Sequence, residues 1–374
     1  MIARSLLRWL PTLLLVGGWL FTPSGARLDT QLRETSARDA FRLLDWESTA
    51  LGTRLNQIWD GLLGNTPLSE DDRQAVRAYF AAPSEGRDTL RSPAERGVER
   101  ALETGLRALG VGPAAPLPGL FPPVLIAFTT SPNVLIVAPR AELRVLSSTL
   151  LKPLDVSQQE RLEASADSLG VSSLVVPTGG IATYPAMVLD SGAPAQVVAS
   201  SAHEWVHHYL VFRPLGAAYW SNQEAREINE TVADLVAQEV GARAADLLGL
   251  PPLPAPPSAP PPPAASARPP EFDFRAFMRA TRLEVERLLA AGRVEAAEAY
   301  MQGRQVEVAR QGYPIRKLNQ AYFAFYGSYG EGFAASPRSP VPALLRQVRT
   351  ASPSLGAFLR RVEGITTLAE LRAL

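Results

Sequence analysis

The sequence predicts a mainly helical α+β protein, with a small mixed sheet whose edge strand lies beside an active-site helix, plus a helical lobe. Two observations support this class. Apolar residues recur at helical spacing along much of the chain, whereas short runs rich in valine and isoleucine are concentrated between residues 124 and 188. With 374 residues, of which 46% are hydrophobic, the chain can bury a sizeable core, and we expect two lobes.

The composition excludes several classes of function. The 37 basic side chains balance 37 acidic ones, so the chain lacks the electrostatic footprint of a nucleic-acid-binding protein. Cysteine is absent, which excludes disulfides, thiolate metal sites and cysteine nucleophiles. Any chemistry must therefore use oxygen and nitrogen atoms.

Residues 1–26 have the pattern of a signal peptide or an N-terminal membrane anchor. Arg4 and Arg8 precede the uncharged run Trp9–Phe21, and small residues follow it up to Ala26. The run is shorter than the roughly 20 residues of a membrane-spanning helix, so both cleavage after Ala26 and retention as an anchor stay open. The arginines place this end in the cytoplasm, which predicts an extracytoplasmic body that is secreted or membrane-anchored.

An N-terminal helical region is expected over residues 27–120. Apolar spacing predicts one helix over Leu28–Leu63, followed by shorter helices at Ser69–Ala82 and Pro93–Leu109. The segment Ser69–Asp72 is a capping signal, because the serine hydroxyl and the carboxylates can accept hydrogen bonds from the free amides of the first turn.

The segment 121–248 is expected to be the core that carries the site. A turn at Thr129–Pro132 predicts a hairpin between the first two strands, and Pro185 limits the last apolar run to an edge or bulged strand. The predicted strands are Val124–Phe128, Asn133–Ala138, Ser172–Val176 and Ile181–Leu189, with a helix at Asp155–Leu169.

A metal-binding motif follows in the predicted helix 195–212. His203, Glu204 and His207 form the pattern HExxH, in which two imidazoles four residues apart lie on one face of a helix and can bind one Zn²⁺. Glu204 then lies next to the open coordination position, where it can take a proton from water. The third and last histidine of the chain, His208, points to another face and is expected to be a core or rim residue.

Three glutamates are candidates for the third ligand. Glu224, Glu227 and Glu230 recur at a spacing of three, but only Glu230 has an acidic residue one turn later, Asp234. That carboxylate can accept the second ring proton of His203. Glu227 stays as the second candidate, and Glu224 is expected on the solvated face of the helix.

The pattern formed by Asn229, Glu230 and Asp234 resembles that of the thermolysin-like zinc peptidases, the gluzincins. The match covers two helices, and the interval from His207 to Glu230 is longer than in thermolysin, whose interval leads to Glu227. The resemblance implies that Glu230 is the third ligand, that Asp234 supports His203 and that Asn229 belongs to the same shell. It also implies that the edge strand Gly180–Val188 pairs with an extended peptide, although an ordinary edge strand covered by a loop is an equal alternative.

These residues predict a zinc metallopeptidase with one Zn²⁺ per chain, held by His203, His207 and Glu230, that acts on extracytoplasmic peptides or proteins. Glu204 is the expected general base. Residues 312–330 also resemble a segment of bacterial membrane-anchored HExxH proteins labelled aminopeptidases, so aminopeptidase activity is one form that the reaction can take. The alternative is a membrane-tethered, zinc-containing binding or scaffold protein without hydrolytic activity.

The C-terminal third begins with a linker. Residues 249–271 are rich in proline and alanine, which predicts an insertion or linker, and residues 272–374 are expected to be a helical lobe that completes the cleft. Its helices are predicted at Phe274–Leu289 and Val294–Gln311. Because no histidine remains to stabilise an oxyanion, the candidate donors are Tyr322, Tyr326, Tyr329 and Arg316.

Overall fold

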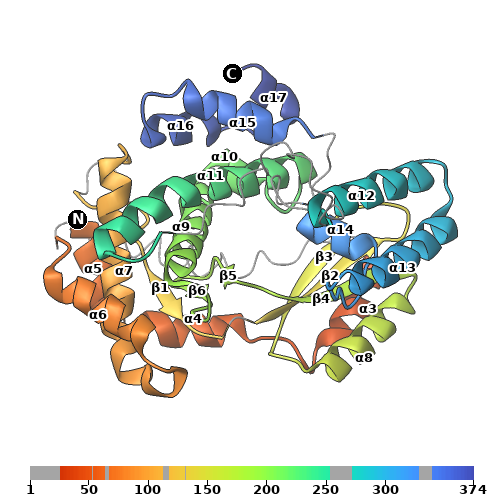
Figure 1. The fold of residues 1–374 in the computed structure, drawn as a ribbon, viewed down its shortest axis with the longest axis horizontal. Coiled ribbons are helices and arrows are strands. Elements are labelled where there is room, and N and C mark those ends of the chain that lie inside the picture. Colours follow the sequence, from red (N-terminus) through yellow and green to blue (C-terminus); the bar gives the residue numbers. More distant parts are fainter. Residues whose placement is uncertain are drawn as a thin grey trace, which may run out of the picture.

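The computed structural model describes residues 26–52, 54–63, 67–112, 118–130, 132–252, 272–327 and 339–374. Its fold is α+β and mainly helical, as the sequence predicts (Figure 1). The N-terminal segment up to residue 25 and the linker from 253 to 271 lie outside these residues. Among the helices of the described ranges, none is both long and apolar enough to cross a bilayer.

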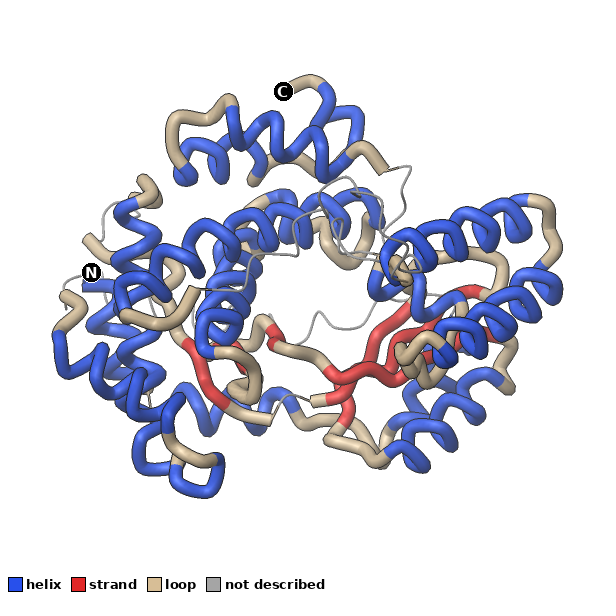
Figure 2. The backbone as a smooth tube through the Cα atoms, viewed as in Figure 1, coloured by secondary structure: helices blue, strands red, loops and turns tan. Residues whose placement is uncertain are grey.

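The strands form two separate three-stranded sheets (Figure 2). The first is mixed, because its central strand pairs in parallel with one neighbour and antiparallel with the other. The second is antiparallel. In spatial order, the first contains β1 (Ile126–Phe128), β6 (Ala186–Val188) and β5 (Gly180–Ile181), and the second contains β3 (Ser147–Leu151), β2 (Asn133–Pro139) and β4 (Val171–Pro177).

The predicted hairpin between β1 and β2 is wrong, because the two strands belong to different sheets. β1 pairs with β6. Two amides of β1 donate to carboxylates of α7 (Asp88–Ala108) and not to a hairpin partner: the Ile126 amide donates to Glu99 (2.9 Å) and the Phe128 amide to Glu95 (2.7 Å). These two buried glutamates therefore take the place that a hairpin partner would occupy.

The N-terminal region contains more helices than expected. The single helix predicted over 28–63 is divided into α3 (Ala26–Ser36), α4 (Leu43–Gly52) and α5 (Leu55–Leu63). The first break occurs where Ala40 bridges to Leu151 and the Phe41 amide donates to the Leu150 carbonyl (2.9 Å), which attaches the chain to the edge of β3. The helix α6 (Glu70–Ala81) begins with the predicted capping box of Ser69 and Asp72.

Two long helices carry the site. The helix α9 (Pro194–Leu210) precedes the short α10 (Pro214–Ala217), and the 26-residue α11 (Gln223–Leu248) packs directly against α9. Gly241 of α11 makes this approach possible, because a Cβ atom there would lie 2.7 Å from the Cα atom of Ala199. Both helices contribute to the largest hydrophobic core, together with α7.

The C-terminal helices pack on two different cores (Figure 1). Three of them cover the antiparallel sheet, namely α12 (Phe274–Ala290), α13 (Val294–Arg310) and α14 (Gln320–Tyr326). The other three join the core around α11, namely α15 (Val341–Thr350), α16 (Leu355–Val362) and α17 (Leu368–Arg372). The segment 272–374 therefore contributes to both sides of the molecule.

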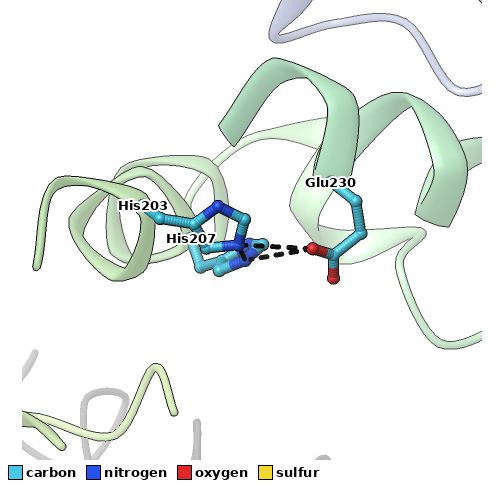
Figure 3. Close-up of side chains that lie close together, drawn as sticks. All are labelled: His203, His207 and Glu230. Atoms are coloured by element: carbon cyan, nitrogen blue, oxygen red, sulfur yellow. Dashed lines mark hydrogen bonds and ion pairs between the residues drawn. The ribbon is translucent and has the colours of Figure 1, made fainter. Parts of the chain in front are cut away.

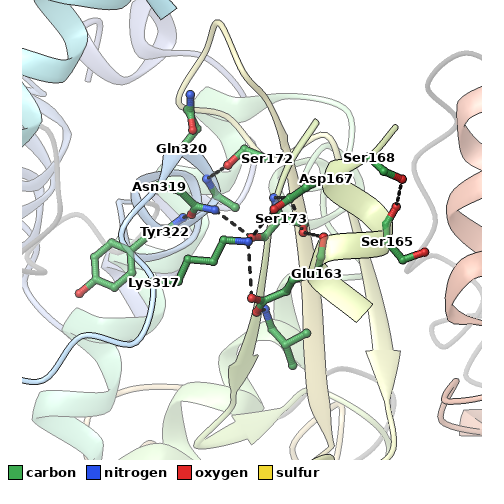
Figure 4. A network of polar contacts seen from close by, with 12 residues as sticks. Glu163, Ser165, Asp167, Ser168, Ser172, Ser173, Lys317, Asn319, Gln320 and Tyr322 are labelled. Carbon is green, nitrogen blue, oxygen red and sulfur yellow. Dashed lines mark hydrogen bonds and ion pairs between the residues drawn. The ribbon is translucent and has the colours of Figure 1, made fainter. Parts of the chain in front are cut away.

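A polar network fixes the segment before α14 (Figure 4). Lys317 donates to Asp167 of α8 (Val156–Asp167) at 2.8 Å, and Asn319 donates to the Ser173 carbonyl of β4 at 2.8 Å. Glu163, also on α8, is ion-paired with Lys317 at 3.5 Å. These bonds hold α14 against the sheet.

We expect Gly241→Ala to lower the free energy of unfolding by about 1–3 kcal/mol, because the added methyl group forces α9 and α11 apart. The matched control is Gly303→Ala in α13, where a Cβ atom would meet nothing within 4 Å. Alanine has the higher helix propensity, so this control should gain up to about 1 kcal/mol. Urea unfolding of both variants tests the packing, and a Gly241→Ala protein as stable as the wild type would contradict it.

Candidate metal centre

Two histidines of α9 and one glutamate of α11 converge on a common point (Figure 3). The Nε2 atoms of His203 and His207 lie 3.1 Å apart. The Oε2 atom of Glu230 lies 3.3 Å from the Nε2 atom of His203 and 3.7 Å from that of His207. Of the three predicted acidic candidates, Glu230 is thus the one that joins the histidines.

The spacing of these three atoms fits a metal ion. Tetrahedral zinc with bonds of about 2.0–2.1 Å places its ligand atoms about 3.3–3.4 Å apart, close to the separations seen here. The Oε2 atom of Glu230 is buried and accepts no hydrogen bond from any described residue. Its contacts with the two ring nitrogens are not hydrogen bonds, and a buried oxygen without a hydrogen bond is costly, so a cation between the three atoms would remove that cost. The group can therefore hold a metal ion.

Contacts behind the histidines orient both rings. The Nδ1 atom of His203 lies 3.0 Å from Asp234 Oδ1, and the Nδ1 atom of His207 lies 2.8 Å from Asn229 Oδ1. These oxygens only accept hydrogen bonds, so each ring carries its proton on Nδ1 and turns the Nε2 lone pair towards Glu230. Asn229 and Asp234 thus occupy the supporting positions that the resemblance implies.

Tyr219 is a member of this site that the sequence analysis missed. Its hydroxyl donates to Glu230 Oε1, and its ring lies 5.9 Å from that of His207. Burial alone would raise the pKa of Glu230, but its contacts with His207 and His203 and the hydrogen bond from Tyr219 lower it to about 2. The carboxylate is therefore ionised, with one oxygen fixed by Tyr219 and the other free to bind a metal.

Glu204 lies against β5, the edge strand of the mixed sheet. The single edge strand predicted over Gly180–Val188 is wrong in part, because the chain leaves the sheet between β5 and β6 and β6 is the central strand. A Cβ atom at Gly180 would be 2.9 Å from the Cδ atom of Glu204, so the absence of a side chain at Gly180 allows this contact. Burial raises the pKa of Glu204 to about 7. Glu204 does not belong to the group of residues that could hold the metal ion, so its carboxyl group is available for proton transfer.

The other acidic candidates make contacts elsewhere. Glu227 is hydrogen-bonded to Ser339, and burial raises its pKa. The exposed Glu224 accepts a hydrogen bond from the Leu368 amide (2.8 Å). The turn of α11 that follows these two residues is the one that faces α9.

None of the three predicted oxyanion donors that the structure describes lines the cavity of the metal ligands. Tyr322 is buried in the core beside the antiparallel sheet, and the Tyr326 ring packs on it at 4.7 Å. Arg316 is bound to Glu163 (2.9 Å), and Tyr329 lies outside the described residues. Among the described residues, Tyr219 and Arg226 are donors that line the same cavity as the ligands, and the Arg226 guanidinium lies 5.0 Å from the ring centroids of both Tyr219 and Trp220.

His208 is buried, as expected for a core histidine. Its Nε2 atom donates to the Thr183 carbonyl (2.6 Å), and burial lowers its pKa to about 4. It therefore ties α9 to the loop between β5 and β6.

The metal ligands open onto a cavity of about 210 Å³. Its lining comes from α9, α11 and the residues between them, from β5 and the loop after it, and from α4, β2, β3 and α14. The lining residues of α4, β2 and β3 include Leu43, Glu47, Ile136 and Ser148.

No protein-family model, curated protein or solved structure matches this chain.

We expect Glu230→Gln to lose bound zinc, because a neutral amide is a poor ligand and leaves two imidazoles alone. Glu227→Gln, one turn earlier on the same helix, should keep one zinc per chain. Elemental analysis of both variants after dialysis against trace zinc decides between the two glutamates. A Glu230→Gln protein with full zinc content would remove Glu230 from the ligand set.

Proposed function

We propose that the protein is a zinc-dependent hydrolase that cleaves peptide bonds. The observation that carries this proposal is the arrangement of Glu204, a buried carboxyl group beside two oriented imidazoles and one carboxylate but outside the ligand set. A closed structural metal site has no need of such a group, whereas a hydrolytic site needs a base beside the open coordination position.

The ligand set favours zinc. Two imidazoles and one carboxylate form the three-ligand set of catalytic zinc sites. When bound, the ion supplies Lewis acidity, which polarises a carbonyl group and lowers the pKa of a coordinated water molecule towards about 7. His203, His207 and Glu230 would hold it, and Asp234, Asn229 and Tyr219 would keep these ligands in place.

Glu204 moves the proton in this proposal. A general base is most effective when its pKa lies near the working pH, and burial brings that of Glu204 to about 7. It accepts the proton of the attacking water and later delivers it to the leaving amine. The neighbouring strand β5 has no strand partner beyond β6 among the described residues, so an extended peptide can pair along it.

Extracytoplasmic peptides or proteins are the proposed substrates, because residues 1–26 have the composition of a targeting segment. If that segment is retained, the membrane is a further partner through it. Among the charged residues of the sequence, acidic and basic groups balance, which argues against nucleic acid as a substrate.

We expect Glu204→Gln to keep one zinc per chain and to lose about two to four orders of magnitude of peptidase activity, because the amide cannot accept the proton. The test incubates the zinc-loaded wild type and variant with a mixed peptide library and identifies the cut ends by mass spectrometry. Equal cleavage by both would refute the role of Glu204. Zinc in both with cleavage by neither would favour a binding or scaffold protein.

A further inference from the structure

The cavity that holds the metal ligands is also lined by two polar side chains that the proposed reaction does not use, here called the polar patch. They are Glu47 on α4 and Ser148 on β3. The Glu47 Oε2 and Ser148 Oγ atoms are buried and have no hydrogen-bond partner among the described residues. Buried polar atoms are nearly always paired, so two orphaned atoms in one cavity indicate a ligand that would satisfy them.

The carboxyl group of Glu47 is held in place by its other oxygen. Its Oε1 atom accepts a hydrogen bond from the Tyr184 amide (3.2 Å). The same peptide unit offers its carbonyl, that of Thr183, to His208 of the metal-binding helix (2.6 Å). One peptide group thus links Glu47 to α9, and this link fixes the Glu47 carboxyl group relative to the metal-binding helix.

The patch is acidic and lacks a compensating cation. No described lysine, arginine or histidine forms an ion pair with Glu47, which is 1% exposed. Burial raises its pKa to about 7. A buried carboxyl group in this state is stabilised by a positively charged ligand that donates hydrogen bonds to it.

The surroundings of the patch are apolar. Leu43, Val134, Ile136 and Leu150 line the same cavity, and Ile181 and Phe325 also line it. The cavity volume of about 210 Å³ leaves room for the side chain of one substrate residue.

We propose that Glu47 and Ser148 bind a primary ammonium group of the substrate while the scissile carbonyl lies at the metal. This inference rests on the proposed function, and it deepens it by assigning the substrate class: peptides that place one cationic, partly apolar residue in the cavity. The ammonium group has two possible sources, the free α-amine of a peptide's first residue or the side chain of a lysine. The α-amine would restrict the enzyme to trimming from the amino end.

Binding of three small amides to the zinc-loaded full chain tests the proposal without hydrolysis. The probes are leucinamide, N-acetyl-leucinamide and N-acetyl-lysinamide, titrated into the Glu204→Gln protein and into the same protein with Glu47→Gln added. Glutamine keeps the volume of Glu47 and its bond to the Tyr184 amide, so only the charge is lost. The matched control is Asp45→Asn, which removes an exposed charge from the same helix.

We expect Glu47→Gln to weaken the binding of the amine-bearing probe about 10–100-fold, the size of one charged hydrogen bond, whereas Asp45→Asn leaves it unchanged. Preference for leucinamide over its acetylated form identifies the α-amine as the ligand. Preference for N-acetyl-lysinamide identifies the lysine side chain.

Two results would overturn the assignment: affinities within twofold of each other with and without Glu47, or no binding of any probe to the zinc-loaded protein. The outcome is independent of the peptidase test. Glu47-dependent amine binding by a protein that cleaves no peptide would refute the hydrolase and keep the amine site. Cleavage at a rate that is independent of N-terminal acetylation, of lysine in the peptide and of Glu47 would support the hydrolase and refute the amine site.

Discussion

The contact between α9 and α11 is the constraint on which the site depends. Two ligands lie on α9 and the third on α11, together with Asn229 and Asp234, which orient the two imidazoles. The ligand atoms meet only if the helix axes approach closely, and Gly241 against Ala199 permits this approach. The large hydrophobic core around the two helices therefore contributes to metal binding as well as to folding.

Polar groups in the interior show where the molecule is adapted for binding. Outside the cavity, buried carboxylates have clear structural partners: Glu95 and Glu99 bind the amides of β1, and Glu163 binds Arg316. Of the six buried side-chain atoms without a hydrogen-bond partner among the described residues, four belong to residues that line the cavity, namely Glu47, Ser148, His208 and Glu230. Because such atoms cost stability, their concentration at one place is best explained by the ligands that they receive.

Local patterns in the sequence predicted much of this arrangement. Helical spacing placed His203 and His207 on one face, and the acidic residue one turn after Glu230 identified the ligand that the structure brings to them. Features that depend on distant segments were not predictable. The strand β3 was not predicted, because its sequence is partly polar. The glutamates of α7 occupy the place of the expected hairpin partner. Tyr219 and Glu47 reach the site only through tertiary packing. The tyrosines of α14, predicted as oxyanion donors, belong to a hydrophobic core. Aromatic residues at helical spacing more often indicate core packing than function.

The most direct test of the central claim is X-ray absorption at the zinc edge on the purified, zinc-loaded chain from residue 27 onwards. The account predicts one zinc per chain with four nitrogen or oxygen neighbours at about 2.0–2.1 Å, two of them imidazoles, and one position that exchanges with an added inhibitor such as a hydroxamate. A spectrum with a single imidazole, a closed shell that no inhibitor enters, or a protein that retains no zinc would contradict it.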